Sequence, residues 1–85
     1  MYVIVKTLYS DGSGAEVGTL IDRSTDGVVY TDWDIAVESA HCMARARLNS
    51  HPDWTLKIEY SRLSVFAEWG LRAEFTIFAL CSVGD

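Results

Sequence analysis

The sequence has no hydrophobic run long enough to cross a membrane, and we expect no leader for export. A transmembrane helix needs roughly 18 consecutive apolar residues, and the apolar stretches here are all shorter. The first residues, Met1-Tyr2-Val3-Ile4-Val5-Lys6, lack the basic head and the cleavage site of a signal peptide. These absences predict a cytoplasmic protein that does not bind a membrane.

Cysteine is scarce, and the two that occur, Cys42 and Cys81, do not form a disulfide framework. Cys42 falls in a helical pattern and Cys81 in an apolar strand pattern, which is typical of small buried or half-buried thiols in a reducing compartment. A zinc site would have to combine these cysteines with His41 and His51. On a helix His41 and Cys42 point about 100° apart, and no Cys-x-x-Cys or His-x-x-x-His pair is present, so the sequence predicts no metal site.

Basic residues are few and scattered, whereas acidic residues are concentrated. Twelve Asp and Glu against seven Lys and Arg give a net charge of −5. Residues 11–38 hold seven acidic residues and one basic residue, Arg23, which gives that segment a net charge of −6. Nucleic-acid binding draws its energy from cations that displace phosphate counterions, so direct binding to nucleic acid is not expected. Asp is common in turns and at helix starts, but such a segment also suits a partner with a basic surface.

Length and hydrophobic patterning predict one α+β domain spanning residues 1–85. The chain is 49% hydrophobic and 22% charged, close to the globular average. We expect an antiparallel sheet of about five strands in the order β-β-β-α-β-β, with one helix packed across one face. The predicted strands cover residues 2–9, 15–23, 28–30, 54–63 and 71–82. The pattern over 63–70 fits either a strand or a loop.

The predicted helix runs from Thr31 to about Asn49. Thr31 is the expected cap, with Asp34 three residues later as in a capping box, and Pro52 ends the pattern. One apolar stripe recurs at helical spacing and is expected to face the sheet: Trp33, Val37, Ala40, Ala44 and Leu48.

Two motifs invite a chemical interpretation. Asp22-x-Ser24-x-Asp26-Gly27-x-Val29 matches the first half of an EF-hand calcium loop, but the position of the closing glutamate is Trp33. The same residues also make a good hairpin turn, so a calcium-responsive binding domain is one alternative function. Glu38 and His41 lie one helical turn apart, the spacing of an acid/base pair, but such a pair on a polar helix stripe is more often a solvated surface. A chain this short also has little room for a pocket that excludes water. We therefore expect no enzyme and no cofactor.

In size, acidity and simple α+β architecture the chain resembles the small inhibitor proteins encoded by phages and mobile elements, anti-CRISPR proteins among them. This resemblance implies a non-catalytic protein that binds another protein and occludes its basic nucleic-acid-binding surface. The residues expected to carry binding are the acidic residues and two tryptophans as aromatic anchors: Asp22, Asp26, Asp32, Asp34, Glu38, Trp33 and Trp69.

A second alternative is a self-assembling structural module. Phe78 and Leu80 alternate with Phe75 and Ile77, so they point to the face opposite the expected helix. Pairing of strand edges, or burial of Phe78 and Leu80 across a two-fold axis, would make a homodimer.

Overall fold

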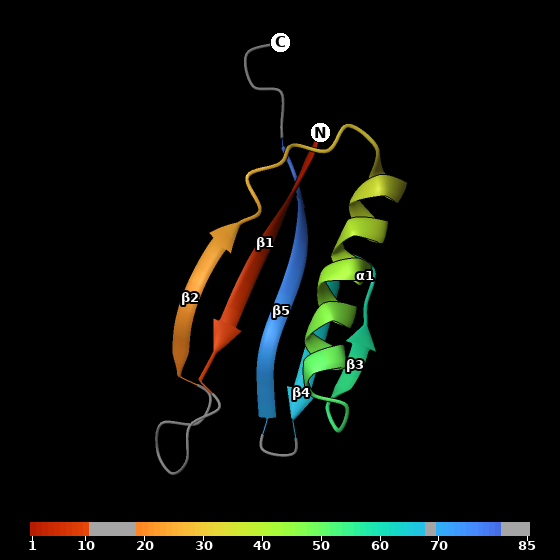
Figure 1. The fold of residues 1–85 in the computed structure, drawn as a ribbon. Coiled ribbons are helices and arrows are strands. Elements are labelled where there is room, and N and C mark those ends of the chain that lie inside the picture. Colours follow the sequence, from red (N-terminus) through yellow and green to blue (C-terminus); the bar gives the residue numbers. More distant parts are fainter. Residues whose placement is uncertain (11–18, 68–69, 81–85) are drawn as a thin grey trace.

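The computed structural model describes residues 1–10, 19–67 and 70–80, which form one antiparallel sheet with a single helix on one face (Figure 1). The elements in chain order are β1 (Tyr2–Tyr9), β2 (Leu20–Thr25), α1 (Trp33–Ser50), β3 (Thr55–Ile58), β4 (Arg62–Ala67) and β5 (Gly70–Ala79). The predicted α+β class, with five strands and one helix, is confirmed.

The order of the strands along the chain differs from the prediction on each side of the helix. Residues 28–30, predicted as a third strand, form only an isolated bridge in which Tyr30 pairs with Tyr2. They follow Gly27, whose positive φ of 78° turns the chain, and three residues are too few to continue a ladder. For the segment 63–70 the sequence allowed either a strand or a loop, and the structure shows that it supplies most of β4. Among the described elements, two strands therefore precede the helix and three follow it.

The spatial order of the strands is β2-β1-β5-β4-β3. The central pair, β1 and β5, runs in unbroken antiparallel register from Tyr2 opposite Ala79 to Leu8 opposite Ala73. Because successive side chains of a strand point to opposite faces, Phe75 and Ile77 lie on the helix side of β5 and Phe78 lies on the other. The alternation predicted for this strand is confirmed for these residues.

Small residues bring the helix close to the sheet. Ala36, Ala40 and Ala44 recur every four residues on α1 and are fully buried. They pack against apolar side chains from three strands: Ile4, Leu63, Val65, Ala73, Phe75 and Ile77. Larger residues flank the alanines and are partly buried against the same core: Trp33, Val37, Met43 and Leu48. The predicted stripe is thus the packed face of the helix.

The helix begins at Trp33, and its cap is Asp32, one residue after the predicted cap Thr31. The Asp32 carboxylate accepts a hydrogen bond from the Asp34 amide at 2.8 Å. Aspartate satisfies the first free amides of a helix at least as well as threonine does. At the other end the His51 amide donates to the carbonyls of Arg47 and Leu48, both at 3.1 Å.

One helix does not cover the whole sheet. Among the described elements, α1 contacts β1, β3, β4 and β5 but not the edge strand β2, which lies apart from it in Figure 1. No described element packs on the opposite face of the sheet. Within the part of the chain that the structure describes, no helix combines the length and apolar character needed to cross a bilayer.

Candidate functional site

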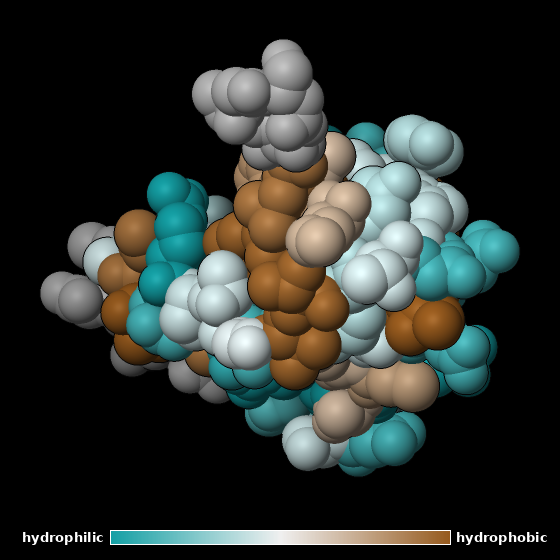
Figure 2. Space-filling view, turned by 90° about the horizontal axis from the view of Figure 1, so that it is seen from above, coloured by the Kyte–Doolittle hydropathy of each residue, from teal (hydrophilic) through white to brown (hydrophobic). Residues whose placement is uncertain are grey.

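Exposed hydrophobic side chains gather at the end of the sheet where the helix begins. The antiparallel pairing brings the start of β1 and the ends of β2 and β5 to this end (Figure 1). Figure 2 looks onto it and shows a band of hydrophobic side chains between more polar ones. We call this surface the apolar end and define it by its exposed hydrophobic side chains: Met1, Val28, Val29, Tyr60, Phe78 and Leu80.

Backbone hydrogen bonds hold the segments of the apolar end together. The Leu80 amide donates to the Met1 carbonyl at 2.8 Å, which joins the end of β5 to the start of β1. On the other side of β1, Tyr2 and Tyr30 exchange two hydrogen bonds of 2.7 and 2.8 Å. The exposed Val28 and Val29 are therefore fixed beside the central strands of the sheet.

Three aromatic rings form a stack at this end. Trp33 and Tyr2 pack in an edge-to-face arrangement with ring centroids 5.3 Å apart, and Trp33 stacks on Tyr60 at 5.0 Å. Trp33 is partly buried against the core, whereas Tyr60 is 86% exposed. Trp33, predicted as an aromatic anchor, thus supports the exposed ring of Tyr60.

Tyr60 is presented by a tight turn between β3 and β4. The Glu59 amide donates to the Arg62 carbonyl at 2.8 Å, and the Arg62 guanidinium donates to both Glu59 carboxylate oxygens at 3.0 and 3.1 Å. The strand predicted over residues 54–63 includes Tyr60, which is wrong because β3 ends at Ile58. The pair of opposite charges at Glu59 and Arg62 was the available signal for a turn.

Four of the predicted acidic residues lie near the start of the helix, but two of them have structural partners. Asp26 accepts hydrogen bonds from the Val28 amide at 3.2 Å and from the Tyr30 hydroxyl, and Asp32 caps α1. Their carboxylates are therefore occupied within the fold. Asp34 and Glu38 are exposed on the first two turns of α1, and within the described residues their carboxylates accept no hydrogen bond.

The hydrogen bond to Asp26 also changes the acidity of Tyr30. The carboxylate accepts a hydrogen bond from the Tyr30 hydroxyl, and this bond, together with burial, raises the pKa of Tyr30 above its ordinary value. Tyr30 is thereby held as a neutral donor that ties the chain after β2 to the helix start.

The remaining predicted residues do not join this group. Asp22 lies on β2 opposite Leu8 and accepts a hydrogen bond from the Ser24 hydroxyl at 3.3 Å. Trp69 lies outside the described residues. Because Asp22 and Ser24 belong to an extended strand, the chain here does not wrap as a calcium loop does. Among the described residues, no three His, Cys, Asp or Glu side chains gather as metal ligands.

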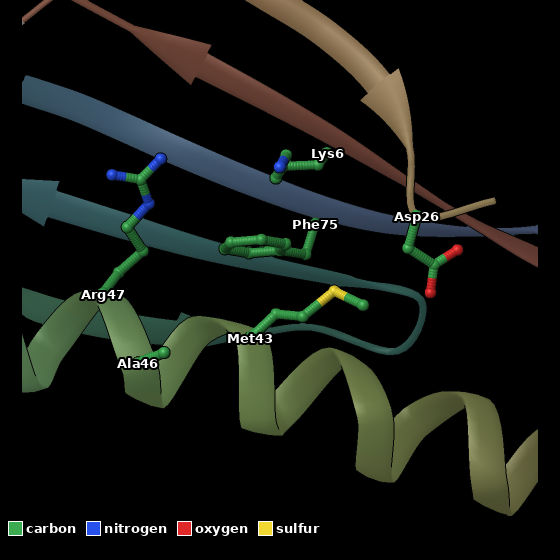
Figure 3. Close-up of a pocket in the computed structure, with 6 residues that line it drawn as sticks. All are labelled: Lys6, Asp26, Met43, Ala46, Arg47 and Phe75. Carbon is green, nitrogen blue, oxygen red and sulfur yellow. The ribbon is translucent and has the colours of Figure 1, made fainter. Parts of the chain in front are cut away.

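A groove runs between α1 and the uncovered half of the sheet. It encloses about 310 Å³, and Figure 3 shows Met43 and Phe75 at its centre, with Asp26 and Arg47 toward opposite ends. Lys6 and Ala46 complete the described lining. Its charged groups are thus separated by apolar side chains, so the groove offers apolar contact more readily than a converging acid/base pair.

Comparison with known proteins adds nothing to this geometry, because no family model, no curated protein and no solved structure matches the chain.

Proposed function

We propose that this chain is a non-catalytic protein that binds another protein through the apolar end. The observation that carries the proposal is Tyr60, which stands 86% exposed on top of Trp33 at the tip of a fixed turn. Tyrosine and tryptophan are enriched among the energetic hot spots of protein interfaces, and these hot spots cluster near the centre of the interface. The aliphatic side chains around Tyr60 supply the apolar contact area that such a centre requires.

The acidic residues beside the apolar end indicate the chemistry of the partner. Asp34 and Glu38 project from the start of α1 with no internal ion pair among the described residues. A partner with basic residues around an apolar patch would be attracted to this end and oriented on it. Nucleic acid itself is disfavoured, because the same carboxylates would repel its phosphates.

A basic protein surface that handles nucleic acid fits this description. The proposal is therefore an inhibitor that occludes such a surface in the cytoplasm, with no cofactor. The mechanism is steric and electrostatic: Tyr60 and its aliphatic neighbours contact the partner, while Asp34 and Glu38 pair with its Lys or Arg side chains.

The decisive experiment compares capture of partners from a bacterial lysate by the wild-type chain and by the double variant Asp34→Lys/Glu38→Lys. These two positions are chosen because neither carboxylate accepts a hydrogen bond among the described residues, so the fold should survive. We expect wild type to retain a basic nucleic-acid-handling complex, identified by mass spectrometry, and the variant to lose it. Retention should also weaken as salt rises.

The matched control is Asp22→Lys/Asp53→Lys, which changes the net charge equally at exposed sites away from the helix start. Far-UV circular dichroism checks that every variant is folded. Loss of the partner from the first variant and its retention by the control would support a local contact at the apolar end. Capture of the same proteins by all three chains would remove the acidic residues from the proposal.

One observation favours self-assembly as a second candidate. Phe78 is 51% exposed on the sheet face that no described element covers, and it lies opposite Val3. Pairing of two copies through this face would bury both side chains. Light scattering should then give twice the monomer mass for wild type and the monomer mass for Phe78→Asp, whereas a monomeric wild type would rule this candidate out.

A further inference from the structure

The end of the molecule opposite the apolar end holds a cavity with the reverse charge. It encloses about 190 Å³ between the last turn of α1 and the far ends of β1 and β5. Its polar lining consists mainly of cationic and aromatic side chains: Arg47, His51, Arg72, Trp54 and Tyr9. We infer that this cavity binds a small oxyanion, a phosphate or carboxylate group carried on a compact apolar or aromatic body.

Arg72 is the central observation. Its side chain belongs to a residue only 4% exposed, and its Nη1 donates to the backbone carbonyls of Ser10 at 3.2 Å and Leu71 at 3.3 Å. Its Nε is buried and has no hydrogen-bond partner among the described residues. A buried donor without an acceptor is costly, so buried polar atoms of native proteins normally have one. An oxyanion in the cavity would supply the missing acceptor.

A β-bulge in strand β5 places Arg72 at this cavity. The ladder between β4 and β5 shifts register, so that Val65 faces Ala73 while Phe66 faces Leu71, and Arg72 has no opposite residue. Such a bulge interrupts the alternation of side chains and redirects one of them. Arg72 is thereby directed to the cavity at the end of the sheet.

A second guanidinium shares the cavity. Arg47 lies in the last turn of α1 and is partly buried. Among the described residues neither Arg47 nor Arg72 forms an ion pair, and none of the described residues lining the cavity is a carboxylate. Two cations that face one small space repel each other, and an anion between them would convert this repulsion into attraction. Guanidinium groups also match the paired oxygens of carboxylates and phosphates.

The cavity wall indicates the rest of the ligand. His51 and Trp54 stack with ring centroids 3.6 Å apart and nearly parallel planes, and the Trp54 amide donates to the His51 carbonyl at 3.0 Å. Leu8 adds an apolar surface beside them. A bare ion would leave these apolar contacts unused, so a phosphate or carboxylate joined to a small ring or aliphatic group is the better fit.

The test is a titration of the full chain followed by ¹H–¹⁵N NMR at constant ionic strength. The probes are inorganic phosphate, phenyl phosphate and benzoate, and the signals are the Arg72 Nε–H and the Trp54 indole N–H. We expect saturable shifts, with at least one of the two ring compounds binding about tenfold more tightly than inorganic phosphate because its ring is buried. The tighter of the two identifies the oxyanion. Shifts that rise linearly, or appear only outside the cavity, would overturn the inference.

A matched pair of variants tests the cationic lining. Arg47→Gln removes a cavity guanidinium, whereas Arg45→Gln removes the same charge from an exposed position of the same helix. We expect Arg47→Gln to weaken binding about tenfold and Arg45→Gln to leave it within twofold. Equal affinities of the two variants would show that the cavity does not recognise the anion. This site stands apart from the apolar end, so its failure would leave the proposed function untouched.

Discussion

The two faces of β5 differ in composition, burial and cover. Toward α1 the strand presents Phe75 and Ile77, which are buried, whereas away from it Thr76 is partly buried and Phe78 is 51% exposed. The described part of this short chain contains one helix, so only one face of the sheet is covered by a second layer. An antiparallel sheet tolerates this arrangement because its strands alternate between apolar and polar side chains.

The buried face of the sheet stabilises the fold, whereas the exposed face and the apolar end remain available for contact with other molecules. The hydrophobic stabilisation of the fold is concentrated under the helix, where the alanine stripe meets the sheet. The open face and the apolar end keep hydrophobic side chains that the fold itself does not bury. Residues of the same type, a few positions apart, should therefore respond very differently to substitution.

The largest effect is expected from Phe75→Ala, with Phe78→Ala as its control on the same strand. Phe75 is fully buried, so its removal loses apolar contact and leaves a cavity, at a cost of about 3–5 kcal/mol. Phe78→Ala should cost less than about 1 kcal/mol because half of its surface is already in water. Urea unfolding of both variants measures the difference, and equal losses of stability would mean that the two faces are not distinct.

The alanine stripe offers the next largest effect. Ala40 has no exposed surface, so Ala40→Leu forces extra atoms between helix and sheet and should destabilise the fold by about 1–3 kcal/mol. Ala46 is exposed on the same helix, and Ala46→Leu should change stability by no more than about 0.5 kcal/mol. Similar tolerance of leucine at both positions would contradict the close approach of the helix.

Periodicity alone was sufficient to predict the covered face. The helix stripe and the alternation of Phe75, Ile77 and Phe78 are local patterns, and each survives in the structure. Predictions failed where the pattern was short or where partners were remote. The three residues 28–30 could not show whether they would find a ladder or a single bridge, since that depends on the distant Tyr2.

The site residues were harder to predict for the same reason. Asp26 and Asp32 look like free charges in the sequence, and only the fold shows that Tyr30 and the helix start use them. The approach of Arg47 and Arg72 depends on a bulge, which no local pattern near Arg72 announces. Charge counted along the chain therefore revealed the acidic segment but not the basic cavity.

Substitutions at the N-terminal cap of α1 measure how much the first turn of the helix contributes to the stability of the fold. Asp32→Ala removes the acceptor of the Asp34 amide and should cost about 1 kcal/mol. Asp34→Ala keeps the cap and loses only a favourable charge in the first turn, at a cost of about 0.3–0.5 kcal/mol. Urea unfolding resolves the order of the two losses. A larger loss for Asp34→Ala would assign the stabilisation to charge and not to the hydrogen bond.

The smallest effect, about 0.5 kcal/mol at neutral pH, is expected for Tyr30→Phe, which removes the hydrogen bond to Asp26. Its pH dependence is the sharper readout. The pKa of Tyr30 is raised in the folded chain, so the unfolded chain loses this proton first, near pH 10. The contribution of Tyr30 is therefore complete below about pH 10 and is lost as pH rises through the folded pKa.

Urea unfolding between pH 8 and 11 should accordingly show that wild type loses stability faster than Tyr30→Phe, so that the two curves converge. Tyr60→Phe is the matched control, because the Tyr60 hydroxyl makes no hydrogen bond among the described residues and lies in the solvent-exposed stack. It should follow the wild-type curve. Parallel curves of wild type and Tyr30→Phe would mean that the hydrogen bond to Asp26 does not raise the pKa of Tyr30. The end of β2 and the helix start would then be linked by the backbone bridge between Tyr30 and Tyr2 alone.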